Sequence, residues 1–321
     1  MVESKPFHTI DYAISAVRPQ VLAKHVEQTR EKDTLSAAIL DSMKYRLTAF
    51  NFLMRNRSLP PEQQKGIVYF VGLVGAADDV TDNDPNAPMT SKRDLEEYIL
   101  NQEIQLEGDK KHGKTISIGE LKEHTLNCFP ESKKKILNDF LDSVLEAQLK
   151  SKGDLGEYGY EQAFEYRRQT SEAYSRAGLL LAGVTDEAKI EEIVNAGIAW
   201  QWLDDIGDLS DDVRKGVKNL VAGVANDIPE NELKVLKSVK NSTPVGGHFK
   251  MAKQAMESRR LLKQMPKTRA KIQEEYTKVV KMLPGYEGKF LRQVGRMWLK
   301  DEKPHDSLYS SVLEMPLPGS M

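Results

Sequence analysis

Residues 67–84 read IVYFVGLVGAADDVTDND, an apolar stretch that ends in a cluster of aspartates. The apolar residues of this stretch recur at the spacing of one helix face: Ile67, Phe70, Val71 and Val74. Asp78 continues that stripe, so its carboxylate should point inward, and Asp82 follows one turn later on the same face, with Asp79 beside them. Adjacent inward carboxylates repel one another, and a bound divalent cation removes that penalty.

A second acidic segment, AGIAWQWLDDIGDLSDD (196–212), closes another predicted apolar helix. Its acids recur on one helix face: Asp204, Asp208 and Asp212, flanked by Asp205 and Gln201. Mg²⁺ prefers oxygen ligands and usually bridges one or two carboxylates to a substrate phosphate. Two acid-bearing helix ends that face each other across a cavity would therefore clamp a diphosphate through Mg²⁺.

Two plainer interpretations compete with a magnesium site. A single acidic cluster is usually a solvated helix end, but two clusters that each close an apolar helix favour metal binding. A calcium loop starting at Asp82 would need Gly at its sixth position and Glu at its twelfth. Ala87 and Arg93 stand there instead, which excludes that motif.

Helical periodicity extends over most of the 321 residues and predicts an all-α fold. Further helices are expected over seven ranges: 35–54, 133–152, 158–183, 187–208, 246–264, 267–283 and 286–299. Residues 106–118 are polar and predict a surface loop, and the tail from about 304 is polar and rich in Pro and Gly. No linker divides the chain, so residues 1–321 are predicted to be a single-domain helical bundle around a central cavity.

Composition restricts the classes of partner. The 46 basic and 48 acidic side chains nearly balance, so no general attraction to nucleic acid is expected. Cys128 is the only cysteine, which excludes an internal disulfide and favours a reducing, cytoplasmic setting. The longest apolar run is well short of the roughly 20 residues that cross a bilayer, so no transmembrane segment is expected. Nothing in the sequence indicates an oligomeric state.

The two acidic segments carry a family resemblance. AFNFLMRNRSLPPEQQKGIVYFVGLVGAADDVTDND (49–84) resembles the squalene/phytoene synthase family, in which an aromatic-rich helix, a Leu-Pro-Pro-Glu-like turn and an Ala-Asp-Asp-x-x-Asp helix end follow one another. QWLDDIGDLSDD (201–212) resembles the second motif of that family and equally the FQxxDDxxD motif of trans-prenyltransferases. The resemblance covers roughly residues 45–85 and 165–225. It implies a class I isoprenoid synthase bundle that ionises a prenyl diphosphate with Mg²⁺.

The departures from these families narrow the expected reaction. Gly75 and Gly207 occupy positions where squalene and phytoene synthases carry Arg, and Asp204 replaces their Asn. The Gly-Gly-Lys-Arg-like element with which trans-prenyltransferases bind isopentenyl diphosphate has no counterpart. The resemblance therefore favours a terpene cyclase acting on farnesyl diphosphate. The alternatives are a squalene/phytoene-type or chain-elongating prenyltransferase, and a non-catalytic helical relative.

Several basic and aromatic residues are candidates for substrate contacts. Arg gives bidentate hydrogen bonds to phosphate, and four cations near the second segment are candidates: Arg167, Arg168, Arg176 and Lys215, with Arg214 and Arg46 as weaker ones. Class I cyclases often keep a diphosphate-sensing Arg on such a helix, and of Arg167, Arg168 and Arg176 the last is best placed to face inward because it lies in an apolar run. Aromatic faces stabilise carbocations, and these rings flank the motifs: Phe50, Phe52, Tyr69, Phe70, Phe164, Tyr174, Trp200 and Trp202. Each could equally be an ordinary core or surface residue.

The predicted site thus has three parts. Asp78, Asp208 and Arg176 are assigned catalytic roles. Substrate contacts are assigned to Arg167, Arg168, Arg176, Lys215, Phe70 and Trp200. The metal ligands are Asp78, Asp79, Asp82, Asp204, Asp205, Asp208 and Asp212.

Overall fold

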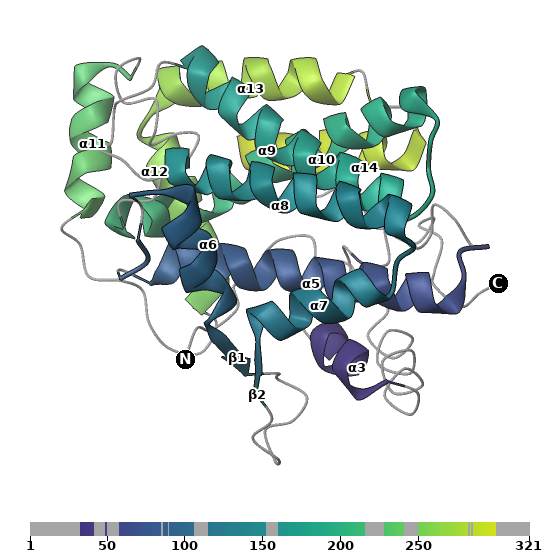
Figure 1. The fold of residues 1–321 in the computed structure, drawn as a ribbon. Helices are drawn as coiled ribbons and strands as arrows, with labels where there is room; N and C mark the ends of the chain where they lie inside the picture. The colour runs from purple at the N-terminus through teal and green to yellow at the C-terminus, as the bar shows by residue number, and fades with distance from the viewer. Residues whose placement is uncertain are drawn as a thin grey trace.

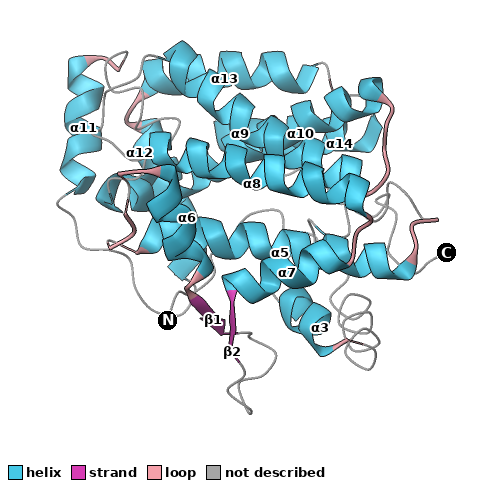
Figure 2. Ribbon diagram, viewed as in Figure 1, coloured by secondary structure: helices cyan, strands magenta, loops and turns pink. Residues whose placement is uncertain are grey.

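The structure is a computed structural model of the whole chain. It describes residues 33–41, 49, 58–84, 86–88, 90–105, 115–151, 160–215, 228–240, 250–281, 283 and 285–299. Eleven helices and two short strands make up these parts of the chain: α3 (Thr34–Asp41), α5 (Pro61–Asn83), α6 (Lys92–Leu100), β1 (Glu103–Gln105), β2 (Thr115–Ser117), α7 (Ile118–Asn127), α8 (Glu131–Ser151), α9 (Tyr160–Leu181), α10 (Glu187–Lys215), α11 (Glu230–Lys240), α12 (Lys250–Lys263), α13 (Pro266–Lys281) and α14 (Gly285–Leu299). The all-α prediction is confirmed (Figures 1 and 2).

The helices pack around α9 and α10. In Figure 1, α5 and α7 form a lower layer, α8, α9 and α10 cross the centre, and α13 lies above them. α9 contacts α5, α8 and α10, while α10 also packs against α11, α12, α13 and α14. The small antiparallel hairpin of β1 and β2 extends from the lower layer. Within the described helices, none is both long and apolar enough to cross a bilayer.

α5 begins at Pro61, directly after Pro60, and is buried because most of its residues are apolar. Pro61 occupies the first helical position, where the missing N–H costs nothing, and Glu62 lies favourably in the first turn. From residue 66 to residue 81 only Val74 and Asp78 are half-buried, and all others are buried. The helix therefore runs through the core and exposes one narrow stripe.

The turn between α9 and α10 makes these two helices antiparallel. α9 ends at Leu181, and two residues later Gly183 has a φ of 82°, which is readily adopted only by a residue without a side chain. The N–H of Gly183 donates to the carbonyl of Leu180, and the N–H of Val184 donates to that of Leu179, both at 2.9 Å. This pair of hydrogen bonds is the Schellman ending of a helix, and it reverses the chain direction.

The structure differs from the predicted elements at three places, and a fourth prediction falls largely outside the described part. α10 does not end at the second acidic cluster but continues through it to Lys215. Thr115–Ser117 pair with Glu103–Gln105 as strands and so shorten the loop expected over 106–118, whose residues 106–114 lie outside the described part. Of the helix expected over 35–54, only Thr34–Asp41 and the helical residue Ala49 fall within the described part. Three short helices, α6, α7 and α11, were not expected.

Glu232 is a buried cap whose removal should destabilise the bundle. Its carboxylate accepts hydrogen bonds from the backbone N–H groups of Lys267 and Thr268, both at 2.9 Å, at the start of α13. Burial opposes ionisation, but the hydrogen bonds from Thr268 and Lys267 outweigh it and hold the pKa of Glu232 below its ordinary value. Glu232→Gln should therefore lower the free energy of unfolding at pH 7 by about 1–3 kcal/mol.

The pH dependence gives the sign of this effect. Because the pKa of Glu232 is lower in the folded protein than in the unfolded chain, its ionised carboxylate stabilises the fold at pH values above the unfolded-state pKa. This stabilisation is lost as the pH falls through the folded-state pKa. The difference in urea stability between the wild type and Glu232→Gln should thus shrink as pH falls below 4.5. Glu230→Gln, at an exposed position of the same helix, is the matched control and should change stability little. A difference that stays constant down to pH 3 would contradict the assignment.

Candidate functional site

The first acidic cluster lies in the last turns of α5. Asp78 is half-buried, whereas Asp79 is 8% exposed. Asp82 belongs to the same helix, but its side chain lies outside the described part. The carboxylate expected to face inward is therefore the accessible one of the two described, and it follows Val74 on the single accessible stripe of α5.

The second cluster lies inside α10 and has its own accessible stripe. Between residues 196 and 213 the half-buried positions all fall on one helix face: Gly197, Trp200, Gln201, Asp204 and Asp208. Asp205 and Asp212 are each 7% exposed and lie further round the helix. Asp211, at 6% exposed, was not predicted as a ligand, although its spacing of one turn from Asp208 would have indicated it. Of the predicted carboxylates in this cluster, Asp204 and Asp208 are thus half-buried, and Asp205 and Asp212 are buried.

Contacts of α9 with α5 and α10 set the heights of the two clusters along the helix axes, and these heights are similar. We refer to this common height as one level. The hydroxyl of Ser171 on α9 donates to Gln201 on α10 at 2.5 Å, which sets the register of this antiparallel pair. The rings of Phe70 on α5 and Tyr174 on α9 stack with centroids 5.8 Å apart. Lys133 donates both to Gln63 of α5 at 2.7 Å and to the carbonyl of Leu181 of α9 at 2.6 Å.

These contacts fix the direction and register of α5. The start of α5 lies near the end of α9, so α5 is antiparallel to α9 and hence parallel to α10. Asp78 lies about 12 Å further along α5 than Phe70, which stacks on Tyr174 of α9. Because α9 is antiparallel to α5, the residue of α9 beside Asp78 lies about 12 Å before Tyr174, which is residue 166. The register through Ser171 and Gln201 places residue 166 level with Ile206, between Asp204 and Asp208.

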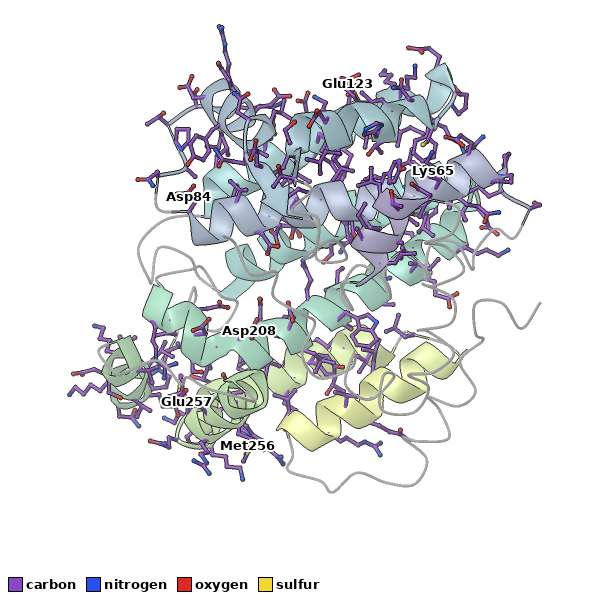
Figure 3. The ribbon with its side chains drawn as sticks, turned by 90° about the horizontal axis from the view of Figure 1, so that it is seen from below. Lys65, Asp84, Glu123, Asp208, Met256 and Glu257 are labelled. Carbon is purple, nitrogen blue, oxygen red and sulfur yellow. The ribbon has the colours of Figure 1, made fainter. Side chains whose placement is uncertain are left out.

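The view in Figure 3 agrees with this register. Lys65 lies in the first part of α5 and Asp84 directly follows its last residue, and in this view Asp208 of α10 lies on the side of Asp84. α5 and α10 hardly touch along their described residues, since α9 packs against both. The carboxylates of Asp78 and Asp208 thus come from two helices that make few direct contacts with each other along their described residues.

The predicted cations are distributed unevenly around this level. Arg168 is exposed on α9 at the level of Asp204, and Arg167 precedes it, with its side chain outside the described part. Lys215 is the last residue of α10, and its side chain is also outside the described part. Arg46 lies among the residues that are not described. Arg214 is paired with Glu257 of α12 on another face of α10.

Arg176 forms ion pairs with glutamates near the turn that joins α9 to α10. Its guanidinium lies 2.7 Å from Glu187, 3.0 Å from Glu191 and 3.5 Å from Glu172. The hydrogen bond with Glu187 is the main cause that raises the pKa of Arg176. Glu191 precedes Asp204 by about 20 Å along α10. The structure thus separates Arg176 from the second cluster with which it was predicted to act.

The aromatic candidates divide into core and accessible rings. Phe70 is fully buried in a cluster with Phe140, at 5.1 Å between centroids, and Tyr174. Among the rest, Trp202 is fully buried, and Tyr69 is buried with its hydroxyl bonded to Asp33. Three candidate rings lie outside the described side chains: Phe50, Phe52 and Phe164. Trp200 is half-buried on the same stripe as Asp204, so it is the ring best placed beside the carboxylates.

The described acidic and imidazole side chains do not form a complete metal-binding group by themselves. Within the described side chains, no three His, Cys, Asp or Glu residues are gathered closely enough to hold a metal ion by themselves. Mg²⁺ commonly takes only one or two carboxylates and completes its shell with water and substrate phosphates. The half-buried Asp204 and Asp208, one turn apart on α10, and the half-buried Asp78 on α5 are oxygen donors of that kind. The donor set therefore fits Mg²⁺ shared with a phosphate-bearing substrate.

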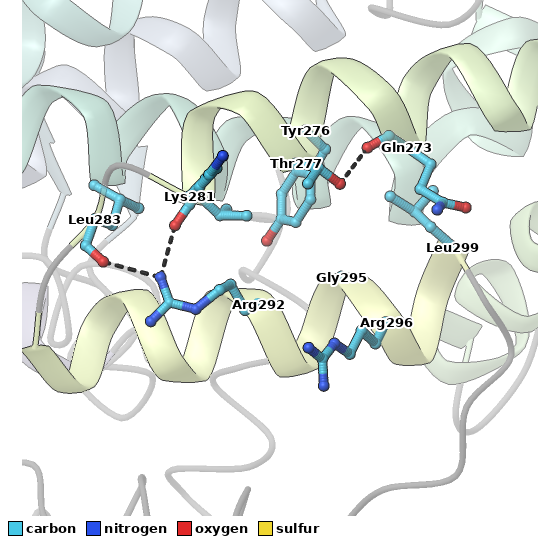
Figure 4. Close-up of a pocket in the computed structure, with 10 residues that line it drawn as sticks. Gln273, Tyr276, Thr277, Lys281, Leu283, Arg292, Gly295, Arg296 and Leu299 are labelled. Atoms are coloured by element: carbon cyan, nitrogen blue, oxygen red, sulfur yellow. Dashed lines mark hydrogen bonds between the residues drawn. The ribbon is translucent and has the colours of Figure 1, made fainter.

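A pocket of 420 Å³ lies elsewhere, between α13 and α14. Figure 4 shows Arg292 reaching from α14 to the end of α13, where it donates to the carbonyls of Val280 and Leu283. The hydroxyl of Tyr276 donates to the carbonyl of Leu291, and its ring lies where a Cβ on Gly295 would stand. None of the predicted site residues lines this pocket. The predicted central cavity at the acidic clusters stays a prediction.

Cys128 offers no nucleophile for a competing covalent mechanism. It is buried after α7, and its thiol lies 3.5 Å from Glu62. Burial, together with that carboxylate, raises its pKa to about 12, so the reactive thiolate is scarce near neutral pH.

No protein-family model matches the chain, and no curated protein matches it.

Proposed function

We propose that this chain is a Mg²⁺-dependent class I terpene cyclase that ionises farnesyl diphosphate and cyclises the resulting carbocation. The proposal is supported by the helix register that brings Asp78 on α5 near the level of Asp204 and Asp208 on α10, with all three side chains half-buried. A scaffold without ligands gains nothing from concentrating carboxylates on accessible stripes of two core helices.

In this proposal the acidic residues would bind the metal and the basic residues would bind the diphosphate. Asp78, Asp79 and Asp82 would hold metal on one wall, and the opposite wall would use Asp204, Asp205, Asp208 and Asp212. When bound, Mg²⁺ would supply positive charge that stabilises the departing diphosphate. Arg167 and Arg168 stand near this level and would donate hydrogen bonds to its outer oxygens. Arg176 would first have to leave three glutamates, so it is the weaker donor in this scheme.

The hydrocarbon end of the substrate would need an apolar, cation-tolerant surface. Trp200 lies one turn before Asp204 on the accessible stripe of α10, and Val74 lies one turn before Asp78 on α5. A ring face stabilises a neighbouring carbocation, and exclusion of water protects the cation from quenching. The substrate chain would therefore extend from the carboxylates towards Val74, Trp200 and the partly exposed Tyr174.

A product assay tests the proposal. With Mg²⁺, farnesyl diphosphate alone should yield inorganic diphosphate and a volatile hydrocarbon or alcohol, detected by gas chromatography. Isopentenyl diphosphate or NADPH should change neither the rate nor the product, because the recognition elements for a second substrate are absent from the sequence motifs. Geranyl and geranylgeranyl diphosphates should react more slowly. Squalene or a lengthened prenyl diphosphate as the only product would replace the cyclase with a prenyltransferase, and consumption of no prenyl diphosphate would favour a non-catalytic relative.

A further inference from the structure

Positive charge is concentrated in one stretch of the chain. Residues 250–273, which include α12 and the first half of α13, contain eight Lys or Arg residues and a single acidic residue, Glu257. The rest of the chain contains 38 basic and 47 acidic residues, so it is net acidic. The nearly neutral total charge therefore conceals a strongly basic segment, and a basic amphipathic helix is typical of proteins that dock on a membrane surface.

The structure places much of this charge on the surface. Among the described side chains of α12, the exposed ones fall on one helix face, at Met256, Arg260 and Lys263. Lys267 and Lys271 are exposed on the following helix, α13. We call these five residues the basic face.

The other side of α12 is used within the fold. Leu261 and Leu262 are buried, and α12 packs against α10. Glu257, the one acidic residue of the segment, pairs with Arg214 of α10. The packing of α12 therefore covers its apolar residues, draws its acidic residue towards α10 and leaves cations on the outside.

Met256 adds an apolar side chain to the basic face. It is 56% exposed, and no other large apolar side chain of the described residues is exposed. In Figure 3 it lies near the edge of the molecule, and Asp208 of α10 lies between it and Asp84. A single exposed apolar side chain is common on protein surfaces, but one that lies one turn from Arg260 in a row of cations suits a partner that is both anionic and apolar.

We propose that the basic face is a docking surface for a membrane rich in anionic lipids, with its four cations at the lipid head groups and Met256 inserted between them. Each Lys or Arg close to an anionic membrane strengthens binding by about 5-fold. The same membrane repels the net acidic remainder of the chain, so the protein is oriented with α12 and α13 towards the lipid.

The apolar residue favours a membrane over nucleic acid as the partner. Contacts to a phosphate backbone are made by cations and hydrogen-bond donors, and an exposed methionine adds nothing to them. Insertion of the same side chain among lipid head groups buries apolar surface and strengthens binding. The inference is independent of the proposed function, because the basic face shares no residue with the two acidic clusters.

Co-sedimentation of the full chain with vesicles tests the proposal. The protein should bind phosphatidylcholine vesicles that contain about 30 mol% phosphatidylserine and should not bind vesicles of phosphatidylcholine alone. Salt at about 0.5 M should release it, because attraction between exposed charges is then screened. The double variant Arg260→Gln with Lys267→Gln should bind about 25-fold more weakly, and Met256→Gln should bind several-fold more weakly.

Two further double variants are the controls. Lys135→Gln with Lys189→Gln removes the same charge from exposed positions of α8 and α10 and should leave vesicle binding unchanged. Arg260→Lys with Lys267→Arg keeps both charges and should bind like the wild type. All of these positions are exposed, so no variant should change the melting temperature appreciably.

Three results would overturn the proposal. The first is equal binding to vesicles with and without phosphatidylserine. The second is wild-type binding by Arg260→Gln with Lys267→Gln, or an equal loss of binding in the variant that keeps both charges. The third is binding of the protein to double-stranded DNA or RNA without binding to anionic vesicles, which would assign the basic face to nucleic acid.

Discussion

Removal of divalent metal should abolish turnover of farnesyl diphosphate, and addition of Mg²⁺ should restore it fully. Asp78 and Asp208 are accessible carboxylates at one level, so without a cation they repel the negative diphosphate rather than bind it. The exposed Arg168 lies at that level, and its interaction with a diphosphate would be screened by solvent too strongly to replace the charge of the metal. The expected loss on EDTA treatment therefore reaches the detection limit of a diphosphate-release assay.

A binding measurement makes the metal prediction independent of catalysis. Mg²⁺ together with inorganic diphosphate should raise the melting temperature, whereas either one alone should raise it little. A ligand present at 100 times its dissociation constant stabilises the folded state by about 2.7 kcal/mol, which is easily measured. Ca²⁺ is a suitable comparison cation, because it accepts longer and more irregular coordination. Full turnover of farnesyl diphosphate in thoroughly chelated buffer would contradict the proposed mechanism.

Asp78→Asn and Asp208→Asn should each lower kcat/KM for farnesyl diphosphate by about 100-fold or more, in line with the loss of one preorganised electrostatic contact. Each change removes one anionic oxygen that would hold Mg²⁺ and leaves the side chain nearly the same size. Neither side chain is fully buried, so packing should survive. In metal-free buffer the melting temperature of Asp208→Asn should stay level or rise, because like charges one turn apart on a helix are mildly destabilising.

Asp139→Asn is the matched control for these two variants. Asp139 lies at an exposed position of α8, so the same chemical change occurs away from both clusters and should leave the rate and the melting temperature unchanged. The stabilisation by Mg²⁺ and inorganic diphosphate should persist in this control and weaken in the two cluster variants. If Asp78→Asn keeps wild-type turnover while Asp208→Asn loses it, the metal is held by α10 alone and the two-wall arrangement is wrong.

The helices that the sequence predicts well are those whose burial pattern is regular over several turns. α8, α9, α12, α13 and α14 agree with the expected ranges to within a few residues, because apolar residues at a spacing of about 3.6 identify one buried face. α7 escaped prediction because it is short, although Ser117 and Glu120 form a capping box that marks its start. Ser91, whose side chain accepts from the N–H of Asp94, marks α6 in the same way.

The end of α10 was mispredicted for a different reason. Acidic residues suggested a helix end, but Leu209 and Val213 are fully buried and continue the apolar side of the helix through the cluster. Arg176 illustrates a second limit of local reasoning. Its apolar neighbours predicted an inward guanidinium, whereas Glu187 and Glu191 of the following helix hold it at the closed end of the hairpin. Only the folded hairpin brings those carboxylates within reach of the arginine.

The sequence by itself determined that two helices carry carboxylates one turn apart on a shared face, because helical spacing follows from local backbone geometry. It could not determine that Asp78 and Asp208 lie at the same level, or that Asp79 and Asp205 are enclosed while their neighbours remain accessible. The level depends on the register of three helices, set by the contact of Ser171 with Gln201 and by the stacking of Phe70 on Tyr174. Such contacts join residues far apart in the chain, so the choice among registers rests on the packing of whole helix faces and is made only in the tertiary structure.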